Sequence, residues 1–133
     1  TGASVGILTW LVYGTLNPYG FSLPILAATS TSESVYGIIG GLTARDHGLR
    51  ETGLATNIKF AIIGFLLTFT YDLITNTASA LTTGIPIPVA LITGIPFAAA
   101  HEISNAAFFF VGASPLTTAL SRLFQGETRN ERE

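Results

Sequence analysis

The charged residues of this chain are gathered into two short segments, and this distribution limits what the chain can fold into. Most of them lie in Arg45–Lys59 and Arg122–Glu133, and they make up 11% of the 133 residues, against about 25% in a soluble domain. Elsewhere the ionisable residues are Glu33, Asp72, His101 and Glu102. Such a pattern is typical of membrane spans of about 20 apolar residues joined by short aqueous loops. A buried core of soluble helices is the alternative.

Four apolar runs follow one another and predict an all-α, polytopic membrane bundle of about four transmembrane segments. The runs are Gly2–Leu16, Phe21–Ala44, Asn57–Leu81 and a fourth that follows the tight turn Thr82–Pro88 and ends at Ser114-Pro115. We expect them to form one integral membrane domain over residues 1–133. The first run begins at once and the sequence contains no methionine, which indicates a fragment of a longer natural chain.

The first part of the second run is the least apolar stretch of the four. Asn17–Ser32 contains a proline and many hydroxyl residues, so we expect an extramembrane or re-entrant loop that could cover a site. Ser32 or Ser34 would then cap a short helix that ends at Leu42.

Glycines recur every four residues in the first two runs. Gly2, Gly6 and Gly14 share this spacing with Trp10 in the first run, and Gly37 and Gly41 are four apart in the second. Small residues at this spacing let membrane helices approach each other closely. We therefore expect tight helix packing at both stripes.

Two basic clusters predict the orientation of the bundle. One lies in the loop 45–56 and its border, the other in the charged tail 122–133, and two expected spans separate them. Because Lys and Arg are enriched in cytoplasmic loops, we expect both segments in the cytoplasm. Asn17–Ser32 and Thr82–Pro88 would then face outward, and the chain would be a multi-pass protein of the cell membrane.

Two polar clusters interrupt the third and fourth runs. The third carries its polar residues on one helical face, namely Thr68, Asp72, Thr75, Asn76 and Ser79, with apolar residues opposite. The fourth carries Thr93, His101, Glu102, Ser104 and Asn105. Ionisable residues are costly inside a membrane and mark functional sites by default. A polar bridge that only holds two helices together is the architectural alternative.

The two clusters are expected at the same depth. Asp72 lies roughly 15 Å and His101 roughly 20 Å from the turn between their helices, at about 1.5 Å per residue. No Lys or Arg lies near them in either helix, so the two acids Asp72 and Glu102 are either protonated, share a proton with His101, or await a cationic, donor-rich ligand. Aromatic walls for such a ligand could come from Trp10, Tyr13, Tyr36, Tyr71 and Phe108.

Composition and motifs exclude several other functions. The net charge is −2 with no basic patch for nucleic acid, and without cysteine there is neither a disulfide nor a thiolate metal site. His101-Glu102 begins like a zinc-protease motif, but Asn105 stands where the second histidine is needed. We expect no catalytic motif, no metal site and no cofactor, and we interpret His47 as a solvated surface residue.

The segments Tyr71–Asn76 and Pro96–Asn105 resemble the last two helices of the substrate-binding S components of energy-coupling factor transporters, the vitamin-uptake systems of prokaryotes. The glycine-rich first and second runs look like middle helices of that fold. The resemblance implies a six-helix membrane protein that binds a vitamin-like molecule near its outer face, and whose first helices are missing here. It also implies a transmembrane coupling subunit and two ATPases as partners. The family's small-residue docking motif has no counterpart in this chain.

We therefore expect a non-enzymatic substrate-capture subunit in the lipid bilayer. The residues predicted to bind its ligand are Asp72, Asn76, His101, Glu102, Asn105, Trp10 and Tyr36. A structural membrane subunit with purely architectural polar contacts is the first alternative. An intramembrane enzyme that uses His101, Glu102 and Asp72 for acid–base chemistry is the second.

Overall fold

The chain folds into four α-helices, seen in a computed structural model that describes residues 2–16, 22–47 and 53–130. The helices are α1 (Gly2–Leu16), α2 (Leu23–His47), α3 (Leu54–Thr83) and α4 (Ile87–Asn130). No strand occurs in these described ranges. The all-α prediction is confirmed. The helices correspond to the four apolar runs, although several of their boundaries differ from those expected. The second helix, for example, ends at His47 and not at Leu42.

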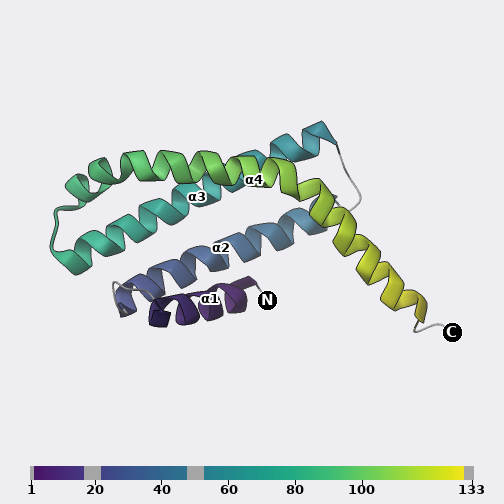
Figure 1. The fold of residues 1–133 in the computed structure, drawn as a ribbon, viewed down its shortest axis with the longest axis horizontal. Helices are drawn as coiled ribbons and strands as arrows, with labels where there is room; N and C mark the ends of the chain where they lie inside the picture. The colour runs from purple at the N-terminus through teal and green to yellow at the C-terminus, as the bar shows by residue number, and fades with distance from the viewer. Residues whose placement is uncertain (1, 17–21, 48–52, 131–133) are drawn as a thin grey trace.

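Each helix packs against its neighbours in the sequence. The packed pairs within the described residues are α1 with α2, α2 with α3, and α3 with α4, so the helices follow one another across the molecule in chain order (Figure 1). The last part of α4 extends away from the other three helices (Figure 1). The molecule is therefore a row of helices that leaves much of its surface uncovered.

The tight turn between α3 and α4 is confirmed and makes these two helices antiparallel neighbours. Gly84 ends α3 with φ 73°, the left-handed conformation that glycine adopts without strain. Its N–H donates to the Ala80 carbonyl, and so does the N–H of Ile85, at 3.1 Å. This compact cap sets the register in which the polar residues of the two helices meet.

The expected loop over Asn17–Ser32 is wrong for residues 23–32, which are helical; residues 17–21 lie outside the described part of the chain. The proline in this segment, Pro24, stands in the first turn of α2, where a missing N–H breaks no helical hydrogen bond. Four of the hydroxyls bond to the backbone of their own helix, as Ser32 Oγ does to the Ala28 carbonyl at 2.9 Å. The hydroxyl of Ser30 is buried and has no partner among the described residues. Neither Ser32 nor Ser34 caps a helix.

The expected end of the fourth helix at Ser114-Pro115 is also wrong. α4 continues through Pro115 to Asn130, so the first part of the charged tail is helical. Pro115 cannot donate to the preceding turn, which is a common cause of helix bending. Ser114 Oγ donates to Asn57 Oδ1 of α3 at this point. This bond attaches α4 to the bundle just before the helix leads away from it.

The distribution of buried residues is the reverse of that in a soluble protein. Among the described residues the buried apolar side chains are Ala28 and Ala80, whereas the buried polar ones are Thr29, Ser32, Thr68 and Asp72. The accessible surface is 9110 Å², compared with about 6,700 Å² for a compact soluble protein of this length. Polar residues thus face inward and large apolar residues face outward.

In the described part of the chain, two helices are long and apolar enough to cross a membrane. They are α3, over Leu54–Thr83, and the part of α4 over Ile87–Ala119. A core helix of a soluble protein would pass the same test but would be mostly buried, and only 17% of the apolar window in α3 and none of that in α4 is buried. The other two helices do not meet both criteria: α1 is apolar but short, and α2 contains the hydroxyl-rich stretch.

The glycine stripes differ in their role. Gly6 is buried, and a Cβ at this position would collide with the Glu33 side chain of α2, so the predicted close approach in the first run is confirmed there. A Cβ at Gly41 would meet nothing within 4 Å, and the expectation fails at that residue. A further close approach, which was not predicted, joins Gly64 of α3 to Phe109 of α4.

Candidate functional site

A direct contact between Asp72 and His101 joins the two predicted polar clusters. Asp72 lies on α3 and His101 on α4, and His101 Nδ1 is 2.9 Å from Asp72 Oδ1 and 3.1 Å from Asp72 Oδ2. The Asp72 side chain is 6% exposed and that of His101 31% exposed. The two residues therefore lie at the same depth, as their distances from the turn predicted.

A chain of hydrogen bonds extends this contact to α2. Asn105 Nδ2, one turn after His101, lies 3.3 Å from His101 Nε2 and donates to Thr68 Oγ1 at 2.9 Å. Tyr36 Oη of α2 lies 2.8 Å from the same Thr68 oxygen, and Thr68 Oγ1 also bonds to the Gly64 carbonyl at 2.8 Å. Thr68 is fully buried. Side chains of α2, α3 and α4 thus share one polar network.

The protons of this network have one consistent arrangement. The Thr68 hydroxyl donates to a carbonyl, so Tyr36 and Asn105 must both donate to its oxygen. The amide nitrogen of Asn105 is only a donor, so His101 Nε2 accepts from it and carries no hydrogen. His101 then holds its proton on Nδ1 and donates it to Asp72. The imidazole tautomer with its hydrogen on Nδ1 therefore fits all of these contacts.

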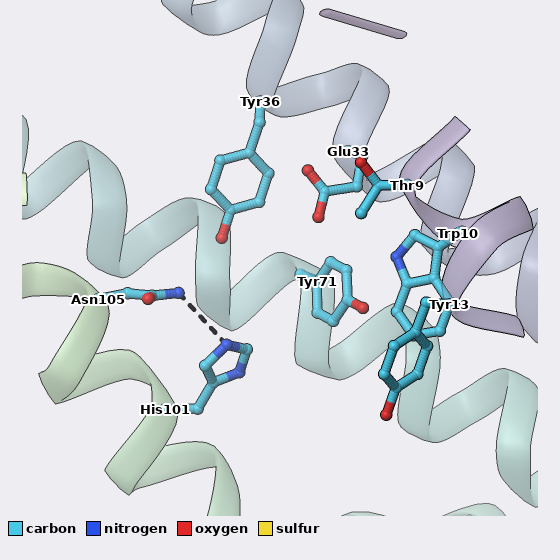
Figure 2. Close-up of a pocket in the computed structure, with 8 residues that line it drawn as sticks. All are labelled: Thr9, Trp10, Tyr13, Glu33, Tyr36, Tyr71, His101 and Asn105. Atoms are coloured by element: carbon cyan, nitrogen blue, oxygen red, sulfur yellow. Dashed lines mark hydrogen bonds between the residues drawn. The ribbon is translucent and has the colours of Figure 1, made fainter. Parts of the chain in front are cut away.

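A cavity of about 400 Å³ opens beside this network, and we call it the central cavity. All four helices reach it, and seven of its eight lining residues are aromatic, ionisable or amide side chains (Figure 2). Its lining residues are Thr9, Trp10, Tyr13, Glu33, Tyr36, Tyr71, His101 and Asn105. Four residues predicted to bind a ligand meet here: Trp10, Tyr36, His101 and Asn105.

Glu33 also lines this cavity, although it is not among the seven residues predicted to bind the ligand. It lies on α2, and its carboxylate points into the space between Tyr36 and Tyr71 (Figure 2). Within the described residues no hydrogen bond or ion pair involves this carboxylate. The signal in the sequence is its position as the one charged residue in the first 44. From the sequence alone, a position at the outer membrane interface is an equal alternative for Glu33.

The aromatic side chains form two groups around the cavity. Trp10 and Tyr13 of α1 meet edge to face, with ring centroids 4.9 Å apart, and Tyr71 meets His101 edge to face at 6.0 Å. Figure 2 shows Tyr71 between His101 and the two α1 rings. Phe108, expected as another wall, is 74% exposed and points away from the bundle. This prediction is wrong because Phe108 lies on the outer face of α4.

Asp72, Asn76 and Glu102 line a second, separate cavity of about 310 Å³ between α3 and α4, which we call the lateral cavity. Apolar side chains complete it, namely Phe69, Leu73, Leu91, Ile92, Ile95, Ala98 and Ala99. Successive residues of a helix point about 100° apart, which separates Glu102 from its neighbour His101. The seven predicted binding residues are therefore divided between two cavities, and Asp72 touches both through its bond to His101.

The central cavity can hold a small molecule, because aromatic rings, the carboxyl group of Glu33 and the amide of Asn105 line one space. In the described part of the chain, no three His, Cys, Asp or Glu side chains gather as metal ligands would. The side chain of His47 lies outside the described residues. Comparisons with protein-family models, with curated proteins and with solved structures give no match to this chain.

Proposed function

We propose that this chain is a membrane-embedded substrate-capture subunit of an importer, and that it binds a small vitamin-like molecule in the central cavity. In this proposal the importer is of the energy-coupling factor type, as the resemblance of the last two helices implies. The central cavity has the volume of small-molecule sites, which is about 300–1,000 Å³. Its lining of aromatic walls with a few polar groups is typical of such sites.

A position in the membrane is supported by the inverted burial of the fold. Exposed side chains along α3 and α4 are mostly large and apolar, such as Leu66, Phe69 and Phe97, whereas Thr68 and Asp72 are buried. Water would make this arrangement unstable, and lipid would make it favourable. We propose that α1 and α2 also cross the bilayer, with four hydroxyls of α2 bonded to their own helix, those of Thr29, Thr31, Ser32 and Ser34.

The single observation that carries the proposal is the unpaired Glu33 carboxylate in the central cavity. A purely architectural polar cluster would pair its charges within the bundle, as Asp72 is paired with His101. Glu33 instead faces the open space of the cavity (Figure 2). An unpaired carboxylate among aromatic rings requires either a proton or a ligand that complements it.

The chain would act together with partner subunits. Its sequence has no phosphate-binding loop, so in this proposal a transmembrane coupling subunit and two ATPases supply the energy of import. The uncovered apolar surfaces of the helix row leave room for such a partner within the bilayer.

Native mass spectrometry of the protein released gently from membranes tests this function. We expect a small molecule to remain bound to the wild-type protein and to be lost from a Glu33→Gln variant, which keeps the shape of the side chain but not its charge. Glu102→Gln is the matched control, because Glu102 lies in the lateral cavity. It should retain the molecule.

Three results would contradict the proposal. An empty wild-type protein whose Glu33→Gln variant folds equally well would favour a structural subunit. Equal loss from both variants would remove the central cavity as the site. Conversion of the bound molecule without any partner would indicate an enzyme.

A further inference from the structure

The wall of the central cavity formed by α2 and α4 uses its hydrogen-bond donors internally. Tyr36 donates its hydroxyl hydrogen to Thr68, and Asn105 donates one amide hydrogen to Thr68 and the other to His101. His101 donates from Nδ1 to Asp72. Because Thr68 in turn donates to Gly64, no donor of this network remains for a ligand.

The groups left over on this wall are acceptors. Asn105 Oδ1 has no hydrogen bond within the described residues, since both recorded contacts of its side chain come from the amide nitrogen. The oxygen of Tyr36 keeps its lone pairs, because its hydrogen is given to Thr68. Glu33 adds a carboxylate beside them (Figure 2). A ligand that touches this wall must therefore supply N–H or O–H donors.

The other walls favour a positive, flat ligand. Tyr71 and Trp10 offer aromatic faces and edges, and aromatic faces attract organic cations. Among the described residues, neither Lys nor Arg lines the cavity, so a carboxylate or phosphate would meet Glu33 without a countercharge. Cation–aromatic attraction and the Glu33 carboxylate therefore both favour a cationic ligand.

We propose that the ligand of the central cavity is a flat organic cation held through its N–H groups, such as an amidinium or a protonated amino-heterocycle. The N–H donors would meet Glu33, Asn105 Oδ1 and Tyr36 Oη, and the ring would lie against Tyr71. This inference rests on the proposed function, because it names the chemical class of that same ligand. Thr68 acts as a positioning residue that keeps the wall free of donors.

Three probes of nearly the same shape test the inference, namely benzamidinium, benzamide and benzoate, with charges of +1, 0 and −1. Trp10 is the one tryptophan in the chain and lines the cavity, so its fluorescence reports binding at the site itself. We expect benzamidinium to bind about tenfold more tightly than benzamide, as one charge-assisted hydrogen bond would provide. Benzoate should give no saturable signal.

Two variants localise the effect. Glu33→Gln should bring the affinity for benzamidinium down to that for benzamide. Glu102→Gln should leave the ratio of these two affinities unchanged. Thr68→Val should reduce the ratio of the affinities for benzamidinium and benzamide, and benzoate should now bind. The reason is that the variant frees hydrogens of Tyr36 and Asn105 to donate into the cavity. A purely structural role for Thr68 would weaken benzamidinium and benzamide by the same factor and leave benzoate without a saturable signal.

The outcomes separate this inference from the proposed function. Equal affinity for the three probes, or preference for benzoate, would overturn the ligand class and leave substrate capture standing. If no probe shifts the Trp10 signal and native mass spectrometry finds no bound molecule, both fall. A preference for benzamidinium that survives Glu33→Gln would also overturn the inference, because the cation would then bind elsewhere.

Discussion

Thr68 has a central role at the scale of single residues, because one buried hydroxyl serves three partners. It accepts from Tyr36 and Asn105 and donates to Gly64. Thr68→Val keeps the shape but leaves two donors without their acceptor, so we expect a loss of about 1–3 kcal/mol in the free energy of unfolding. Thermal unfolding in detergent would measure it.

Thr70→Val is the matched control for this prediction. Among the described residues its hydroxyl bonds only to the Leu66 carbonyl of the same helix, at 2.9 Å, so the change should stay within about 0.5 kcal/mol. Equal destabilisation by the two variants would mean that the network adds nothing beyond its separate bonds.

The residues of the site were predictable from the sequence to the extent that they lie on one helical hairpin. Asp72 and His101 could be paired because the number of helical residues between each of them and the turn gives its depth along the hairpin. Glu33 and Tyr36 reach the cavity only through the packing of α2 on α3, which no local pattern encodes. Which cavity Glu102 faces depends on how α4 is rotated about its own axis, and the sequence alone does not determine this rotation.

At the scale of helices, close approach rather than hydrophobic burial holds α3 against α4. A Cβ at Gly64 would lie 2.5 Å from Phe109 Cδ2, so Gly64→Ala forces the helices apart. We expect it to destabilise the protein by about 1–3 kcal/mol through overpacking. A Gly64→Ala/Phe109→Leu double variant should recover part of this loss, as seen by thermal unfolding.

Gly41→Ala is the matched control, because its effect on the free energy of unfolding should be neutral or stabilising. A Cβ at Gly41 has open space around it, and alanine favours a helix by up to about 1 kcal/mol over glycine. We expect no loss of stability from this variant. If Gly41→Ala destabilised the protein as much as Gly64→Ala, glycine content and not helix contact would explain both.

The helix boundaries show which sequence signals mislead. Hydroxyl-rich stretches suggest loops because Ser and Thr compete for backbone hydrogen bonds, yet in α2 they bond to the preceding turn of the same helix, as Thr29 does to Ile25 at 2.9 Å. Proline suggests a helix end, yet α4 includes both Pro96 and Pro115. The polar face of α3 was predicted well, because it depends only on the period of 3.6 residues.

At the scale of the whole molecule, the inverted burial and the two basic clusters together predict a topology. The apolar part of α4 separates the turn at Ile85 from Arg122, and it is long enough to span a bilayer. If it does so, the two residues lie on opposite sides of the membrane, with Arg122 in the cytoplasm by its charge environment.

The absence of cysteine from the sequence makes this topology directly testable. Single Ile85→Cys and Arg122→Cys variants in intact cells would be treated with a membrane-impermeant maleimide. We expect Ile85→Cys to react at once and Arg122→Cys only after the cells are permeabilised, because both positions are exposed and only the bilayer can protect one of them. Labelling of both in intact cells, or recovery of the protein in the soluble fraction, would remove the membrane span on which the cavity, its ligand and its partners all depend.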